Sequence, residues 1–212
     1  MNILVIGASS GIGRHTVDAA LARGHAVRAM ARGAGRLPPG IAGLEPVAGD
    51  ARDPAAVAGA LTGIDAVVQT LGVGTGRGTL MHEVRLFSEA TAVLLSAMRA
   101  AGVMRLVAVT GFGAGASSRA LSLPERLGQR LLLGGAYADK DRQERLIEAS
   151  DRDWTIVRPT LLADYAGSGR YRVFAEPERW HGGMIARSDV AAFIVDALER
   201  GTHLRRGVVV SR

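Results

Sequence analysis

The sequence predicts an α/β fold: a doubly wound, mostly parallel β-sheet with helices on both faces. Short apolar runs alternate with helix-like segments along nearly all of the 212 residues, which is typical of a parallel sheet with right-handed crossovers. The first run, residues 3–6, is short and rich in isoleucine and valine, and it ends at Gly7. Such a run suits a strand that is buried on both faces. No linker or internal repeat divides the chain, so we expect a single domain.

The later strands and helices follow from the same alternation. Gly24 is suited to end the first helix, Pro54 stands where a first-turn proline belongs, and Ser188 or Asp189 is suited to cap the last helix. The predicted strands after the first are 26–31, 44–47, 66–70, 106–110, 155–157 and 208–210. The predicted helices are 14–22, with a start near Ile12, then 54–61, 83–100, 140–149 and 190–198.

Two segments depart from this alternation of strands and helices and are expected to be loops on the substrate side. Residues 112–135 and 162–185 each follow a predicted strand, so both should lie at the carboxyl edge of the sheet, where this architecture binds ligands. Long loops in a compact domain often act as lids or substrate walls. The alternative is that they only elaborate the surface.

A glycine-rich loop joins the first strand to the first helix. Its glycines, Gly7, Gly11 and Gly13, are spaced G-x-x-x-G-x-G, and Ser9, Ser10 and Ile12 stand between them. Unpaired amides and the positive end of the helix dipole attract a phosphate at such a helix start. In a chain with 28 glycines, a simple tight turn is the competing explanation. The position between a strand and a helix favours phosphate binding.

The composition excludes several kinds of site. The chain has no cysteine, so disulfides, thiolate metal sites and a cysteine nucleophile are impossible. His15, His82 and His181 have no partners at metal-ligand spacing, and we interpret them as surface or capping residues. No metal site is therefore expected.

The charge pattern argues against nucleic acid as a partner. The net charge is +6, but Lys140 is the only lysine, and the arginines are scattered with no basic run longer than Arg205-Arg206. Aromatic residues make up only 4% of the chain, which leaves little for base stacking. Neither a signal peptide nor a membrane-length apolar run is present, so we expect a cytoplasmic protein that binds no membrane.

The end of the second predicted strand indicates which dinucleotide binds. An acidic residue there would favour NAD by accepting hydrogen bonds from the ribose, but the strand ends in Arg32, with Arg36 close behind. A guanidinium group would instead pair with a 2′-phosphate, so we expect NADP(H) in preference to NAD(H). Asp50 ends the third strand, where its carboxylate either faces the adenine amino group or forms a turn after Gly49.

These motifs resemble the short-chain dehydrogenases/reductases, and more closely their atypical branch of NmrA-like and flavin reductase (biliverdin reductase B)-like proteins. The resemblance covers nearly the full length. It rests on 7–13, on Arg32 with 36–38, on Gly49-Asp50, and on 63–68, 155–159 and 188–191. It implies a Rossmann-type fold with the nucleotide bound across the carboxyl edge of the sheet. The positions that are then expected to contact the cofactor are Gly7, Ser9, Ser10, Gly11, Ile12, Gly13, Arg32, Arg36, Asp50, Ala51, Thr70, Leu71, Gly72, Thr110, Lys140 and Pro159.

Catalytic members of the resembled family carry Y-x-x-x-K, and this chain departs from that pattern. Tyr137 precedes Lys140 by three residues, and Ala136 occupies the family's tyrosine position. Lys140 keeps the family's register with Glu144, which implies a role at the ribose or nicotinamide. Tyr137 remains a candidate proton donor, because residues three apart share a helix face. Thr110 is the candidate hydroxyl beside the acceptor, although Gly111 is the alternative match to that position.

The resemblance also implies that 70–74 line the cofactor and that Arg158-Pro159 shape the nicotinamide pocket, with a structural proline bend as the alternative. We therefore expect an NADPH-dependent reductase that passes hydride to a small conjugated acceptor resembling a flavin or quinone, acting as a monomer or homodimer. The first alternative is a non-catalytic NADP(H)-binding redox sensor. A nucleotide-sugar epimerase or dehydratase is the second alternative.

Overall fold

A computed structural model describes residues 1–72 and 84–212, without the side chains of residues 125 and 130–133. It confirms the α/β fold, which has one eight-stranded sheet in the order β3-β2-β1-β4-β5-β6-β10-β8. All neighbouring strands run parallel except β8, which pairs antiparallel with β10. The strands of this sheet are β1 Asn2–Ile6, β2 Ala26–Ala31, β3 Leu44–Ala48, β4 Ala66–Gln69, β5 Arg105–Val109, β6 Asp153–Pro159, β8 Arg172–Phe174 and β10 Arg206–Ser211.

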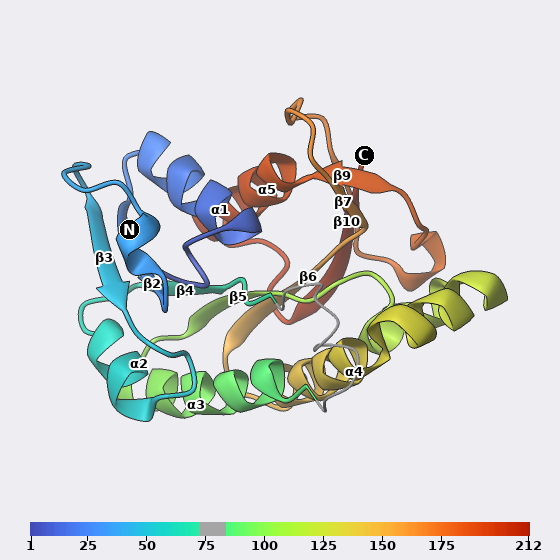
Figure 1. The fold of residues 1–212 in the computed structure, drawn as a ribbon, viewed down its shortest axis with the longest axis horizontal. Helices are drawn as coiled ribbons and strands as arrows, with labels where there is room; N and C mark the ends of the chain where they lie inside the picture. Colours follow the sequence, from blue (N-terminus) through green and yellow to red (C-terminus); the bar gives the residue numbers. More distant parts are fainter. Residues whose placement is uncertain (73–83) are drawn as a thin grey trace.

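Helices cover both faces of the sheet (Figure 1). Helices α1 (Gly11–Ala22) and α5 (Arg187–Glu199) pack together on one face. The other face carries α2 (Pro54–Ala60), α3 (Leu86–Ala101) and α4 (Leu123–Glu148). Within the described residues, no helix combines the length and the apolar character that crossing a membrane requires.

The central strand β1 shows why the sheet is buried on both sides. Successive side chains of a strand point to opposite faces. Ile3 and Val5 therefore enter the core beneath α1 and α5, whereas Leu4 and Ile6 enter the core above α2, α3 and α4. All four side chains are almost completely buried, so the first apolar run of the sequence holds the two layers together.

The first expected loop, 112–135, proves to be mostly helical. A 3₁₀ turn, Gly115–Ala120, is followed by α4, which begins at Leu123 instead of the predicted residue 140. Gly128, Gly134 and Gly135 obscure this helix in the sequence, because glycine disfavours helix interiors by about 1 kcal/mol each. A tertiary contact in this part of the helix opposes that preference, because Gln129 Nε2 donates a hydrogen bond to Phe112 O (3.0 Å).

The second expected loop, 162–185, also contains regular structure. Strand β7 (Leu161–Ala163) pairs with β9 (Met184–Ala186) in a separate small sheet, and β8 joins the main sheet. Strands of three residues are too short to show an alternation in the sequence.

The expected cap of α5 is also wrong, because the helix begins at Arg187 and Ala186 is its N-cap. Ser188 and Asp189 instead accept hydrogen bonds from the backbone of Gly167 (3.1 Å) and Gly169 (2.9 Å). The start of α5 is thereby fastened to the preceding loop. The predicted start of α3 at residue 83 lies outside the described residues, and α3 is described from Leu86.

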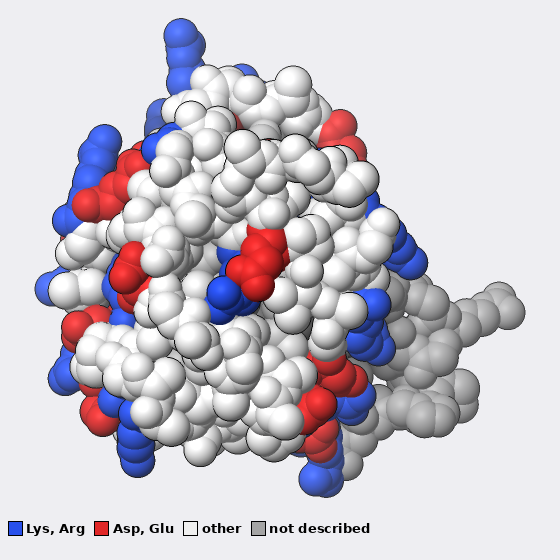
Figure 2. Space-filling view, turned by 90° about the vertical axis from the view of Figure 1, so that its left-hand side faces the viewer, with Lys and Arg blue, Asp and Glu red and all other residues white. Residues whose placement is uncertain are grey.

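The edge strand β3 is protected against pairing with other chains. Pro46 lacks an amide hydrogen, and the exposed Glu45 pairs with Arg28 of β2 (2.8 Å). Figure 2, which faces the left-hand side of Figure 1, shows basic and acidic groups beside one another among uncharged residues. On this face, positive charge forms no continuous patch.

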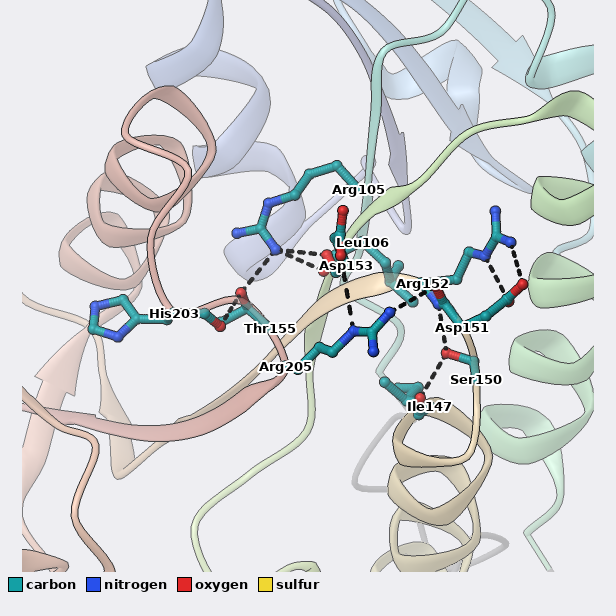
Figure 3. Close-up of polar contacts among 10 residues, drawn as sticks. All are labelled: Arg105, Leu106, Ile147, Ser150, Asp151, Arg152, Asp153, Thr155, His203 and Arg205. Atoms are coloured by element: carbon teal, nitrogen blue, oxygen red, sulfur yellow. Dashed lines mark hydrogen bonds and ion pairs between the residues drawn. The ribbon is translucent and has the colours of Figure 1, made fainter.

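At the amino ends of β5 and β6, Arg105 connects these two strands to the end of α5 (Figure 3). The Arg105 guanidinium group donates to Asp153 O (2.8 Å) and to the Thr155 hydroxyl (2.9 Å) of β6. It also donates to Ala197 O and Thr202 O (both 3.3 Å) at the end of α5. Burial lowers the pKa of Arg105 to about 10, so the group stays charged at neutral pH and ties three elements together.

Arg105→Met is expected to lower the free energy of unfolding by about 2–4 kcal/mol, because it leaves several partly buried carbonyl groups without their hydrogen bonds. Denaturant unfolding followed by circular dichroism measures the change. Arg99→Met is the matched control: the Arg99 side chain is 71% exposed, and its replacement should change stability by less than about 0.5 kcal/mol. Equal stability of the two variants would contradict a clamping role for Arg105.

Candidate functional site

A cavity of about 780 Å³ opens at the carboxyl edge of the sheet. Its lining comes from the residues that follow or end β1, β2, β3, β4, β5 and β6, together with residues of four other elements: Leu86 of α3, Lys140 of α4, Leu162 of β7 and Arg187 of α5. Carboxyl ends of parallel strands meet at one edge, where ligands of this architecture bind. The cavity therefore gathers segments that lie far apart in the sequence.

The amino end of α1 forms one wall and is suited to hold a phosphate. Ser10 is the N-cap, but its side chain makes no capping hydrogen bond, and the first turn contains no acidic residue. The first backbone amides of the helix, from Gly11 onward, thus keep their hydrogen-bonding capacity for an anion.

Two glycines bring the loop close to the neighbouring strand. A Cβ on Gly7 would lie 2.7 Å from Thr70 O, and one on Gly13 would lie 2.2 Å from Gly7 O. Gly7 also has φ +89°, a conformation that favours glycine. Gly13 does not line the cavity, and its role is the close packing of α1. These features fit a diphosphate group at this position.

Arg32 and Arg36 line the cavity at the end of β2. In the part of the chain that the structure describes, no hydrogen bond or ion pair engages either guanidinium group, so both can pair with a ligand phosphate. Asp50 lines the same region, but its carboxylate accepts hydrogen bonds from the backbone (2.9 Å) and side chain of Arg52. These bonds lower the pKa of Asp50, and they match the turn-forming alternative.

Lys140 reaches the cavity at the ends of β5 and β6. Its ammonium group donates a hydrogen bond to Thr110 O and lies 4.6 Å from the centre of the Phe87 ring. Burial lowers the pKa of Lys140 to about 8, although Glu144 and Asp139 act in the opposite direction. The group is therefore a cation at neutral pH that loses its charge in mildly alkaline solution.

The Thr110 hydroxyl is hydrogen-bonded to another side chain of the protein. It donates to Glu144 Oε1 (2.7 Å), and the same carboxylate binds the Arg158 guanidinium group through bonds of 2.7 and 3.0 Å. Glu144 and Arg158 are each only 1% exposed. Thr110 and Pro159 line the cavity, whereas Arg158 does not. The expectation that Arg158 shapes the pocket therefore holds only indirectly: Arg158 binds Glu144, which in turn binds the lining residue Thr110.

Tyr137 lies behind Gly111 and does not line the cavity. A Cβ on Gly111 would stand 2.9 Å from the Tyr137 hydroxyl oxygen. Burial raises the pKa of Tyr137, and a hydrogen bond with Gln129 partly opposes this effect. The phenol is thus protonated at neutral pH, and its role as a proton donor stays a prediction.

The structure brings the expected cofactor residues together around one cavity, with Gly13 as the exception. Residues 73 and 74, as well as His82, lie outside the described residues. Leu162 belongs to the segment 162–185 that was expected on the substrate side, whereas Arg187 lies beyond it and no sequence pattern pointed to it. The lining residues that sequence reasoning did not name are Ala31, Gly33, Leu86, Val109, Leu162 and Arg187. Among the described residues, no group of three or more His, Asp or Glu side chains is placed to hold a metal ion.

Known proteins share this architecture. ChuY, an anaerobilin reductase from Escherichia coli O157:H7, has a TM-score of 0.82 at 25% identity, covering 100% of this chain and 97% of its own. A short-chain dehydrogenase/reductase from Veillonella parvula DSM 2008, solved with NADP, has a TM-score of 0.83 at 18% identity, with coverages of 100% and 94%.

Among curated proteins, an uncharacterized sugar epimerase, YhfK of Bacillus subtilis (strain 168), is 29% identical over 205 residues, which are 94% of this chain and 88% of YhfK. The model of a family described as NAD(P)H-binding matches residues 7–201. With its Rossmann-type fold and its cavity at the carboxyl edge, the chain belongs to this NAD(P)H-binding family.

Proposed function

We propose that the protein is an NADPH-dependent reductase that passes hydride to a small conjugated acceptor of flavin-like or quinone-like shape. The observation that carries this proposal is the continuity of the cavity. The same cavity contains the uncapped start of α1, the two arginines after β2, and Lys140 beside the ends of β5 and β6. One cavity therefore contains candidate partners for the diphosphate, for the 2′-phosphate and for the nicotinamide end of a dinucleotide.

Each wall of the cavity has a separate task in this reaction. The α1 amides bind the diphosphate, and Arg32 and Arg36 pair with the 2′-phosphate. Lys140, held by Thr110 O, positions the ribose next to the nicotinamide. When bound, NADPH supplies the hydride, and the acceptor takes up that hydride together with one proton.

The source of the proton favours a conjugated acceptor. The Thr110 hydroxyl donates to Glu144, and Tyr137 stands outside the cavity lining, so solvent is the proposed proton donor. A flat conjugated acceptor needs chiefly proximity and orientation, whereas an isolated ketone needs a placed acid. The reductase activity named for ChuY supports the proposal by analogy.

The alternative is a redox sensor that binds NADP(H) without turnover, and the engaged Thr110 hydroxyl is the observation that favours it. An epimerase, as the name of YhfK suggests, would require a tyrosine at the reacting end. The position of Tyr137 outside the lining argues against that reaction.

Purified protein mixed with NADPH and a panel of flavins and quinones should oxidise the cofactor, as followed by loss of the absorbance of reduced nicotinamide. Tyr137→Phe keeps the buried ring and should retain the rate within about twofold, because solvent supplies the proton. Tight NADPH binding without turnover of any acceptor would favour the sensor instead.

Arg32→Ala is expected to weaken NADPH binding by about 10- to 100-fold, because a charge-assisted pair with the 2′-phosphate is lost. NADH lacks that phosphate, so its dissociation constant should change by less than about twofold. Isothermal titration calorimetry with both cofactors measures the difference, and Arg99→Ala on the surface is the control. Equal losses for NADPH and NADH would refute the assignment of Arg32.

The affinity for NADPH should fall severalfold as the pH rises through about 8, where Lys140 loses its charge. The sign follows from the lowered pKa: the cation that attracts the anionic cofactor exists below this pH and is lost above it. Binding titrations between about pH 6 and about pH 10 test this dependence. Lys140→Met should bind more weakly at neutral pH and lose the step near pH 8; a step of the same size in this variant would exclude Lys140 as its origin.

A further inference from the structure

The charges around the reacting end of the cavity are all positive among the described lining residues. The lining residues outside the α1 loop and outside the segments after β2 and β3 include the apolar Leu71, Leu86, Val109, Pro159 and Leu162 and the cations Lys140 and Arg187, and they define this end. The acidic residue in the described lining is Asp50, which stands by the arginines after β2. A molecule that fills the reacting end should therefore be apolar over most of its surface and carry negative charge at one point.

The second cation, Arg187, enters from the acceptor side. It directly follows β9, in which Ile185 pairs with Leu162 of β7. Strand β7 begins two residues after Pro159, so Arg187, Leu162 and Pro159 belong to one side of the cavity. In the proposed binding mode the phosphates of the dinucleotide pair with α1, Arg32 and Arg36, which leaves Arg187 for the acceptor.

The present partner of Arg187 is easily replaced. Its guanidinium group pairs with the carboxylate of Asp164, whose side chain is 89% exposed, whereas that of Arg187 is 28% exposed. Water and salt screen a pair with so exposed a carboxylate, and such pairs contribute little stability. A ligand oxyanion in the cavity, shielded from solvent, can therefore compete with Asp164 for the guanidinium group.

The backbone that carries Arg187 is firmly held. The next two residues, Ser188 and Asp189, bind the amides of Gly167 and Gly169, and Asp189 is only 2% exposed. A guanidinium group on such a fixed base offers two parallel N–H donors to a carboxylate or a phosphate. Lys140 is less available for this purpose, because its ammonium group is bound to Thr110 O.

We propose that the acceptor carries an oxyanion, either a carboxylate or a phosphate, and that Arg187 exchanges Asp164 for this group and so selects charged acceptors. This inference rests on the proposed reductase function, since it names the class of acceptor. Arg187 is a specificity-determining residue in this arrangement, and the conjugated part of the acceptor lies on the apolar side chains.

Two matched pairs of acceptors test the proposal and distinguish the two oxyanions. A quinone with a carboxylate side chain is compared with its methyl ester, and riboflavin 5′-phosphate is compared with riboflavin. The intact protein should show a lower KM for the charged member of at least one pair. Arg187→Met should raise that KM by about 10- to 100-fold and leave the KM of the neutral member within about twofold.

Three further variants sharpen the test. Arg187→Lys should retain part of the selectivity that Arg187→Met loses, because lysine keeps the charge but cannot form the bidentate hydrogen bonds of a guanidinium group. Asp164→Asn, which frees the guanidinium group, should lower the KM of the charged acceptor or leave it unchanged. Arg172→Met replaces an exposed arginine of the same segment and should have no effect on either pair.

Binding of all four acceptors to the protein loaded with NADP⁺, measured by calorimetry, separates this inference from the reductase activity. Preference for a charged acceptor that disappears in Arg187→Met supports the inference even without turnover. Equal affinity for charged and neutral members in the intact protein would overturn it. A preference for the charged member that survives in Arg187→Met would also overturn it. The same holds if Arg187→Met raises the dissociation constant of NADP⁺ and not that of the acceptor, because Arg187 would then bind the cofactor diphosphate.

Discussion

The Lys140 end of the cavity depends on one buried ion pair, Glu144 with Arg158. Both groups are almost completely buried, and taking two charges out of water is costly unless their hydrogen bonds are well made. Here the carboxylate receives two bonds from Arg158 and a third from the Thr110 hydroxyl. The pair therefore joins α4, β5 and β6 at one point. Removing either partner would strand the other charge, at a cost of about 3–5 kcal/mol.

The same pair determines where Lys140 stands. Lys140 precedes Glu144 by one helical turn, and the two side chains bind the carbonyl and the hydroxyl of the same residue, Thr110. Asp139, next to Lys140, binds the first amides of α3. Helix α4 is thus fastened at successive positions to β5 and to α3, so the ammonium group is aimed at the cavity by a rigid framework.

Small residues make this framework possible by leaving space for the charged groups. A Cβ on Gly115 would lie 1.8 Å from Glu144 Oε2, and one on Gly207 would lie 2.3 Å from Arg158 Nη1. Trp180, from the segment before β9, packs against the guanidinium group, with its ring centre 5.0 Å from Arg158 Cζ. The segment before β9 is thereby in contact with the Glu144–Arg158 pair.

The sequence alone determined the alternation of strands and helices, the glycine loop and the arginines after β2, because these features depend on neighbours in the chain: periodicity, turn geometry and the residues at strand ends. For that reason it predicted most of the residues that line the cavity beside α1 and β2. Only the tertiary structure decided that the Thr110 hydroxyl donates to Glu144, that Tyr137 lies behind Gly111, and that Arg187 lines the cavity. These outcomes depend on how α4 and the short strands β7 and β9 pack against the sheet, and contacts between residues far apart in the chain leave no local pattern to read.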